Sequence, residues 1–218
     1  MAEHGAIVFT DIVGFTALTD MHGDDVALAL LERQEQMVRV ALPAAARVVK
    51  ELGDGLLLWF DDPCEAIDTC LRLQRDFDAV NDIADAGDAS AGDIPLWVRM
   101  GVHWGCPRRR GDDIVGRDVN LAARIVDLAG PGEVLCSEVT ADATGERPGV
   151  GFEPLGPVFV RGITEPVPIL RVLDSGDRSI SGDAWGPDQS DRADAGFTAT
   201  SSRSSWSGRS RPEGAATP

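Results

Sequence analysis

The sequence contains no tyrosine and a single lysine, and its acidic residues far outnumber its basic ones. Among 218 residues, 20 are Lys or Arg and 36 are Asp or Glu, so the formal net charge is −16. Binding to nucleic acid or to an anionic membrane requires a cationic surface, and we therefore expect neither partner. A small local phosphate site is compatible with this charge.

The sequence also lacks closely spaced pairs of cysteines and apolar runs long enough to span a membrane. The four cysteines show no Cys-x-x-Cys spacing, so we expect neither a zinc site nor a disulfide framework. The longest apolar stretches, near residues 27–31 and 56–60, fall well short of the roughly 20 residues of a membrane-spanning helix. The N-terminus has an early acidic residue and no basic segment, unlike a signal peptide. These absences predict a soluble, cytoplasmic protein.

Composition divides the chain near residue 174. Residues 1–173 have the apolar content and periodicity of one compact domain, whereas residues 174–218 are dominated by Ser, Gly, Asp, Arg and Pro. A segment of that composition buries too little apolar surface to offset its conformational entropy. We therefore predict one domain followed by a disordered tail.

Apolar periodicity and turn residues predict alternating strands and helices in the domain. We expect helices at residues 24–42, 65–80 and 118–128, and a loop at 81–93. We expect strands at residues 6–11, 47–52, 56–60, 96–105, 133–137, 158–161 and 167–173. The order β-α-β-β-α-β fits an α+β fold with a ferredoxin-like (split βαβ), antiparallel-rich sheet and helices on one face.

A first candidate motif combines an acidic residue with the start of a helix. Asp11 ends a buried strand within FTDIVGFT (residues 9–16). The helical turn that follows begins with Gly14, Phe15 and Thr16. Free N–H groups at a helix start bind phosphate, and a neighbouring carboxylate is suited to a Mg²⁺ ion that accompanies the phosphate. Asp11 is equally able to cap the turn, so this segment alone leaves both interpretations open.

A second motif, KELGDG (residues 50–55), places Asp54 at the tip of a predicted hairpin. Gly-Asp-Gly alone is also typical of an ordinary turn. With Asp11 on the adjacent strand, Asp54 would complete a carboxylate pair able to hold two Mg²⁺ ions for in-line attack on phosphorus. Lys50 is the one lysine in an arginine-rich chain, which favours a compact single-donor role that a guanidinium does not fill. Chance survival on a solvated strand edge is the alternative.

A third motif, GDDIVGRDVNLAAR (residues 111–124), places Asn120 and Arg124 on one face of a helix. A neutral amide and a fixed cation on one face suit a sugar oxygen and a transition-state phosphate. Asn120 is alternatively an ordinary polar helix position. Arg124 is alternatively a partner in a surface ion pair with Asp127 or Asp118.

The three segments follow the ordered pattern F-x-D-I-x-G-F-T, K-x-x-G-D-G and D-x-x-x-x-x-x-N-x-x-x-R. Together they resemble the catalytic domain of class III nucleotidyl cyclases. The resemblance covers roughly residues 4–173 and includes RMGVHWG (residues 99–105) and RGITEPV (residues 161–167). Each motif is modest alone, whereas the ordered set is specific.

The resemblance implies roles for residues around the metal ions and the phosphates. Asp11 and Asp54 match the two metal-binding aspartates, with the Ile12 carbonyl as an auxiliary ligand, for two Mg²⁺ or Mn²⁺ ions. Asn120 matches the residue that orients the ribose, and Arg124 matches the residue that stabilises the transition state. Arg161 falls where relatives carry a basic residue near the terminal phosphates.

The resemblance also implies a pair that reads the base, Lys50 and Asp113. The seven-residue step to Asn120 favours Asp113 over its neighbour Asp112. Lysine donates and aspartate accepts, which complements N1 and N6 of adenine, whereas guanine would leave polar groups unpaired at about 1–3 kcal/mol each. The chain therefore looks like an adenylate cyclase that converts ATP to cyclic AMP for intracellular signalling. A guanylate cyclase and a non-catalytic nucleotide-binding module are the alternatives.

Relatives in this family place the site residues in two half-sites at a dimer interface, the metal aspartates in one subunit and the other residues in its partner. This chain carries both sets, so the resemblance implies a homodimer with two sites. A heterodimer with another cyclase-like chain is the alternative. Outside the motifs, we expect His103 to be structural and residues 108–110 to lie in a solvated loop.

Overall fold

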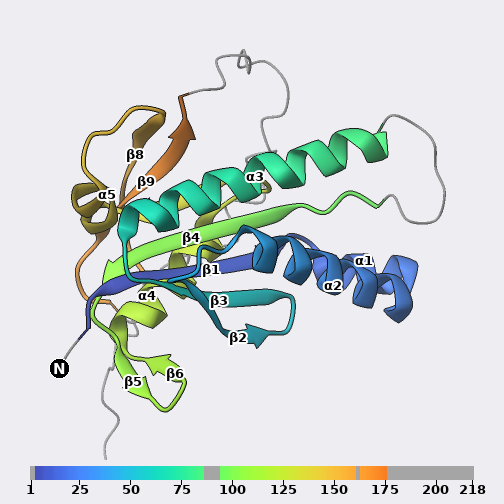
Figure 1. Cartoon of the computed structure of the whole chain (residues 1–218), viewed down its shortest axis with the longest axis horizontal. Helices are drawn as coiled ribbons and strands as arrows, with labels where there is room; N and C mark the ends of the chain where they lie inside the picture. The colour runs from blue at the N-terminus through green and yellow to red at the C-terminus, as the bar shows by residue number, and fades with distance from the viewer. Residues whose placement is uncertain (1–2, 86–93, 161–162, 176–218) are drawn as a thin grey trace, which may run out of the picture. The chain divides into compact units, whose positions relative to one another are not determined.

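A seven-stranded sheet organises the computed structural model, which describes residues 3–85, 94–160 and 163–175 (Figure 1). The strand order is β2-β3-β1-β4-β7-β9-β8, and neighbouring strands are antiparallel except for β4 and β7. These strands are β1 (Gly5–Ile12), β2 (Arg47–Leu52), β3 (Gly55–Phe60), β4 (Val98–Gly105), β7 (Val134–Ser137), β8 (Val150–Val158) and β9 (Val167–Asp174). A separate two-stranded hairpin pairs β5 (Arg108–Arg110) with β6 (Asp113–Val115).

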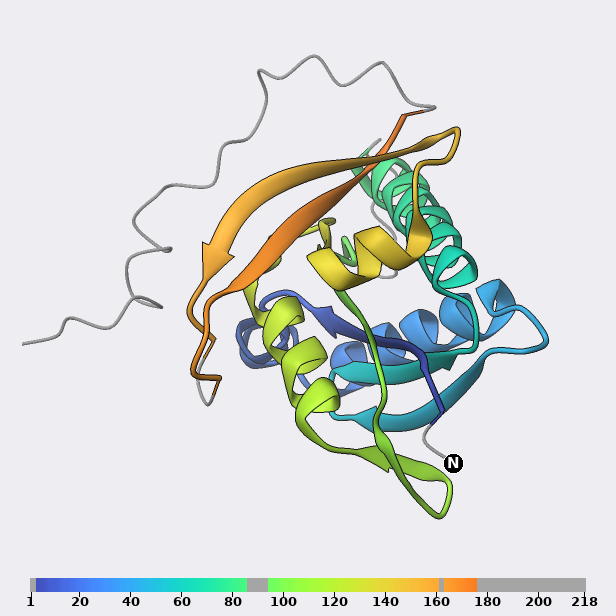
Figure 2. The same cartoon turned by 90° about the vertical axis from the view of Figure 1, so that its left-hand side faces the viewer.

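Helices cover both faces of the large sheet. The helices are α1 (Phe15–His22), α2 (Asp24–Ala41), α3 (Pro63–Asp85), α4 (Arg117–Leu128) and α5 (Glu138–Thr144). Side chains alternate along β1, so Ala6 and Val8 belong to the core under α2 and α3, whereas Ile7 and Phe9 pack with α4. Figure 2 shows α3 and α4 on opposite sides of the central strands.

The expected α+β, antiparallel-rich sheet is confirmed, but the expectation that the helices share one face does not hold for α4. Gly101 explains how α4 reaches the other face. A Cβ atom at Gly101 would lie 2.4 Å from the backbone nitrogen of Val126, so only glycine lets α4 approach β4 this closely. Gly101 thus serves the packing of α4 against β4.

Two expected boundaries are wrong. Residues 81–85, expected in a loop, continue α3. Asn81 supports this extension because its side chain is buried and exchanges two hydrogen bonds with the backbone of Leu96. The first strand of the closing hairpin runs over Val150–Val158 rather than 158–161; it tolerates Pro154 and Gly156 because it is the sheet edge and bulges between them.

Two predictions lie partly or wholly outside the described residues. The predicted tail is described only at residues 174–175, and residue 174 still belongs to β9. Arg161 is not among the described residues. Among those that are described, no helix is both long enough and apolar enough to cross a membrane.

Candidate active site

The two aspartates predicted to bind metal lie at one end of the sheet. Asp11 is the penultimate residue of β1 and opposes Gly55 on β3. Asp54 precedes Gly55 in the β2–β3 turn, and its carbonyl accepts a hydrogen bond from the Ile12 amide at 3.3 Å. The hairpin therefore brings Asp54 beside Asp11, as expected for carboxylates on adjacent strands.

Burial and neighbouring charges act on Asp11 in opposite directions. Burial raises the pKa of the Asp11 carboxyl, and the nearby carboxylates of Asp54 and Asp127 raise it further. A hydrogen bond and the positive charge from Arg99 lower this pKa, without fully offsetting burial. A divalent cation between Asp11 and Asp54 would relieve the same repulsion.

Arg99 is a site residue that our sequence analysis missed. It opposes Asp11 directly on β4, with Nη2 and Nε 2.6 and 2.7 Å from Oδ2 of Asp11. The available signal was its place at the start of the strand in RMGVHWG. What the sequence did not show was the register that sets this arginine opposite the aspartate.

The donor set at this end of the sheet fits Mg²⁺ or Mn²⁺. Two carboxylates and a backbone carbonyl, those of Asp11, Asp54 and Ile12, are the hard oxygen ligands these ions prefer. Among the described residues, no group of three or more His, Cys, Asp or Glu side chains could hold a metal ion by itself. Mg²⁺ commonly takes one or two protein carboxylates and completes its shell with water and substrate phosphate.

The start of α1 offers backbone donors next to Asp11. Gly14 occupies the N-cap position in the left-handed conformation (φ 72°), which favours glycine. No side chain caps this helix, so the alternative in which Asp11 is the cap is not observed. The first amides of α1, including those of Phe15 and Thr16, have no partner within the helix and are suited to phosphate.

The structure brings Lys50 and Asp113 together although 63 residues separate them. Nζ of Lys50 on β2 lies 2.8 Å from Oδ2 of Asp113 at the start of β6, and both side chains are about one-third exposed. The Lys50 hydrogen bond is the main reason why the pKa of Asp113 is lowered. The other oxygen of Asp113 accepts the amide of Ile114 at 2.8 Å. The geometry therefore favours Asp113 over Asp112.

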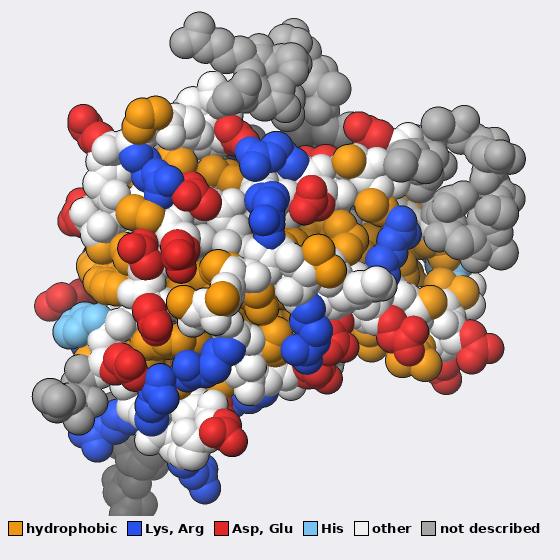
Figure 3. All heavy atoms as spheres, in the orientation of Figure 1, with side chains coloured by type: hydrophobic (Ala, Val, Ile, Leu, Met, Phe, Trp, Pro, Cys, Tyr) orange, Lys and Arg blue, Asp and Glu red, His pale blue; other side chains and the backbone are white. Residues whose placement is uncertain are grey.

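The β5–β6 hairpin gives this acidic chain a local basic surface. Arg108, Arg109 and Arg110 are exposed and form β5, not the loop we expected. Figure 3 shows basic side chains gathered over this hairpin. Arg110 contributes to lowering the pKa of Asp113.

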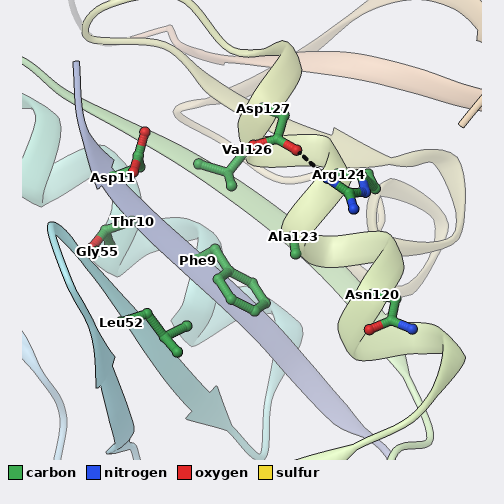
Figure 4. Close-up of a pocket in the computed structure, with 10 residues that line it drawn as sticks. All are labelled: Phe9, Thr10, Asp11, Leu52, Gly55, Asn120, Ala123, Arg124, Val126 and Asp127. Carbon is green, nitrogen blue, oxygen red and sulfur yellow. Dashed lines mark hydrogen bonds and ion pairs between the residues drawn. The ribbon is translucent and has the colours of Figure 1, made fainter. Parts of the chain in front are cut away.

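Asn120 and Arg124 line the same hollow as Asp11. This pocket, of about 220 Å³, lies between α4 and the ends of β1 and β2. Figure 4 shows both residues on α4, across the hollow from Asp11. Its lining residues are Phe9, Thr10, Asp11, Leu52, Gly55, Asn120, Ala123, Arg124, Val126 and Asp127.

Arg124 forms the surface ion pair that was its alternative assignment. Nη1 of Arg124 lies 2.9 Å from Oδ2 of Asp127, and both side chains are half exposed. An exposed pair of this kind contributes only about 0–1 kcal/mol, so it does not prevent Arg124 from turning to a phosphate.

The whole domain matches one family. Residues 2–170 match the model of the adenylate and guanylate cyclase catalytic domain. The chain belongs to this family. It is a class III nucleotidyl cyclase domain, as the ordered motifs implied.

Relatives of this cyclase domain include the pH-sensitive adenylate cyclase MT1302 of Mycobacterium tuberculosis, 30% identical over 84% of this chain and 44% of the relative. The uncharacterized protein Mb2235 of Mycobacterium bovis is 31% identical over 85% of this chain and 45% of the relative. The cyclase domain thus spans less than half the length of these two relatives.

Solved structures share the fold. The adenylyl cyclase CyaB from P. aeruginosa has a TM-score of 0.68 at 24% identity, over 80% of this chain and 96% of that one. An adenylate/guanylate cyclase/hydrolase from Silicibacter pomeroyi has a TM-score of 0.66 at 26% identity, over 80% of this chain and 99% of that one.

Proposed function

We propose that this cyclase domain is an adenylate cyclase, which converts ATP to 3′,5′-cyclic AMP and pyrophosphate. The observation that carries the proposal is the 2.8 Å contact between Lys50 and Asp113. The pair combines one cationic donor with one anionic acceptor. Adenine presents an acceptor at N1 and a donor at N6, so it complements this pair, whereas guanine presents the reverse pattern and leaves groups unpaired.

The carboxylates of Asp11 and Asp54, with the Ile12 carbonyl, would hold two Mg²⁺ or Mn²⁺ ions. When bound, such ions lower the pKa of the ribose 3′-hydroxyl and neutralise charge on the triphosphate. The 3′-hydroxyl releases its proton to water, its oxygen attacks the α-phosphorus in line, the bond from that phosphorus to the bridging β-phosphate oxygen breaks, and pyrophosphate leaves. No covalent enzyme intermediate is required.

The remaining groups bind and orient the nucleotide. Asn120 positions the ribose, and Arg124 leaves Asp127 to stabilise the charge that develops on the phosphoryl oxygens. The amide of the N-cap residue Gly14 and the first amides of α1, at Phe15 and Thr16, bind phosphate oxygens. Arg161 is assigned to the terminal phosphates on the resemblance alone.

We further propose that the active form is a homodimer with two shared sites. Each chain carries both the metal aspartates and the residues that read base and ribose, so two copies are able to complete each other's sites. A heterodimer with another cyclase-like chain would use the same surfaces. Activity per subunit should therefore rise with protein concentration.

The decisive experiment measures cyclic nucleotide formed from ATP or GTP by the purified chain with Mn²⁺. We expect cyclic AMP from ATP, at a rate well above cyclic GTP from GTP. Asp54→Ala should abolish product, whereas Asp142→Ala, an exposed aspartate on α5, serves as the matched control and should not. Equal or better use of GTP would assign a guanylate cyclase. Nucleotide binding without product would assign a regulatory module.

A further inference from the structure

A chain of buried polar groups connects β4, β7 and α5 behind the active-site helix. His103 on β4 is 6% exposed, and its Nδ1 lies 2.8 Å from Oγ of Ser137. That hydroxyl lies 2.9 Å from Oγ1 of Thr140. Oγ1 of Thr140 in turn accepts the amide of Trp104 at 2.8 Å and lies 3.3 Å from the carbonyl oxygen of Val102.

The number of available protons determines which group donates in each of these hydrogen bonds. Thr140 has one hydroxyl proton, and it must point to the carbonyl of Val102 if that bond is made. Ser137 must then donate to Thr140, and Nδ1 of His103 must donate to Ser137. This is the arrangement that makes all the observed bonds at once. In a neutral ring, Nε2 of His103 is therefore an acceptor.

Nε2 of His103 faces another acceptor. Oδ1 of Asp118 lies 3.8 Å from it, which is too long for a hydrogen bond. The neutral imidazole and the carboxylate therefore face each other without a hydrogen bond, because neither of the two facing atoms carries a proton to donate. Adding a proton to Nε2 creates the donor that the gap lacks.

Asp118 transmits any change at His103 to the active-site helix. It lies in the first turn of α4, two residues before Asn120 and on the same helix as Arg124. Its Oδ2 accepts the amide of Cys106 at 2.7 Å. Its side chain also packs on Gly105, where a Cβ atom would lie only 2.7 Å from Oδ2. Asp118 therefore joins the first turn of α4 to the end of β4.

Within the part of the chain that the structure describes, the charged groups that act on the ring come from α4. Burial lowers the pKa of His103, Asp118 raises it, and Arg117 lowers it. The other elements around the ring present uncharged groups: Ser137 from β7, Thr140 from α5 and Ile7, its register partner on β1. The net result is a lowered pKa for His103, with burial as the main cause.

We propose that His103 is a positioning residue that acts through Asp118, and that its protonation draws the first turn of α4 towards β4. The imidazolium donates from Nδ1 to Ser137 and from Nε2 to Asp118. Asn120 then shifts away from the ribose that it positions in the site shared with the partner copy, and turnover falls. The effect on turnover rests on the proposed function, whereas the proton-dependent contact does not.

Nitrogen-detected NMR of the histidine rings tests the contact without any assay of activity. In the wild-type chain, His103 should carry its proton on Nδ1 at neutral pH. Asp118→Asn keeps an acceptor for the Cys106 amide but removes the charge, so the proton affinity of His103 should fall by about 10-fold. A proton on Nε2 at neutral pH, or an unchanged affinity in Asp118→Asn, would overturn the proposal.

The pH dependence of kcat tests the consequence for catalysis. Wild-type kcat should decline over the pH range in which NMR shows His103 taking up its proton, with little change in KM for ATP. In Asp118→Asn the decline in kcat should move to lower pH by about one pH unit, in His103→Gln it should be absent, and in Asp142→Asn it should match the wild type. A decline at the wild-type pH in both Asp118→Asn and His103→Gln would contradict the role of His103. Absence of all product from wild-type protein would instead contradict the proposed function, while the NMR result would still decide the contact.

Discussion

Arg99 and Asp11 face each other across β4 and β1, and two nitrogens of Arg99 lie 2.6 and 2.7 Å from one carboxylate oxygen of Asp11. Nη1 of Arg99 also lies 3.3 and 3.4 Å from the carbonyl oxygens of Asp127 and Ala129 at the end of α4. A cation at this position complements the negative end of the helix. One side chain thus links the predicted metal carboxylate to the helix across the hollow.

Replacing Arg99 should weaken this link. We expect Arg99→Met to lower kcat by about 10–100-fold, because a ligand carboxylate loses the partner that orients it. Arg99→Lys should retain part of the activity, since it keeps the positive charge but loses the planar guanidinium group. Steady-state kinetics with ATP and thermal denaturation of each variant provide the measurement. Normal kcat in Arg99→Met would show that Asp11 needs no such partner.

Replacing Lys50 should change the choice of base. Lys50→Glu removes the donor to adenine N1 and adds an acceptor suited to guanine. We expect the ratio of kcat/KM for ATP to that for GTP to fall by about 10–100-fold. Lys50→Arg keeps the charge and serves as the comparison. An unchanged ratio in Lys50→Glu would show that another residue reads the base.

Removing Arg124 should impair turnover without loss of stability. We expect Arg124→Ala to reduce kcat by about 100–1,000-fold, because Arg124 is assigned to charge that develops in the transition state. The free energy of unfolding should change by less than about 1 kcal/mol, since the ion pair with Asp127 is exposed. Arg39→Ala is a matched control, because Arg39 is also about half exposed and forms ion pairs with Glu35 and Glu51. Equal kcat in the two variants would contradict the assignment.

Burial of His103 should make stability depend on pH. Its pKa lies below the ordinary value of 6.5, chiefly because burial disfavours the charged ring. Below pH 6.5 the unfolded chain therefore binds a proton that the folded chain does not, and stability falls as the pH is lowered towards the folded-state pKa. The contribution reaches at most about 1.4 kcal/mol per pH unit. Denaturant unfolding of wild-type protein and His103→Gln between pH 5 and 8 measures it as a difference in slope. Parallel curves would show that His103 titrates alike in both states.

Local sequence patterns predicted most strands of the sheet. They also predicted that Asp11 and Asp54 lie close together. Both follow from short-range information, because a hairpin of adjacent strands brings its turn beside the end of the neighbouring strand. The face occupied by α4 was not predictable in this way. It depends on the close approach of Val126 to Gly101, a tertiary contact that periodicity does not encode.

The sequence allowed some contacts of the candidate site to be expected and gave no indication of others. The contact between Lys50 and Asp113 was expected only through the resemblance, since 63 residues separate them. A surface ion pair of Arg124 was the alternative interpretation, with Asp127 or Asp118 as partner, and the structure shows the pair with Asp127. Arg99 was missed because its role depends on which residue of β4 opposes Asp11, and strand register is a property of the assembled sheet.

Mixing two inactive variants tests most directly whether this domain is a cyclase with sites shared between subunits. Asp54→Ala and Arg124→Ala should each be inactive in forming cyclic AMP from ATP. Random pairing of equal amounts should restore about one quarter of wild-type activity, because half of the dimers are mixed and each has one intact site. An inactive mixture, under conditions in which both variants are folded and exchange subunits and the wild-type protein is active, would contradict shared sites. An inactive wild-type protein would contradict the cyclase itself.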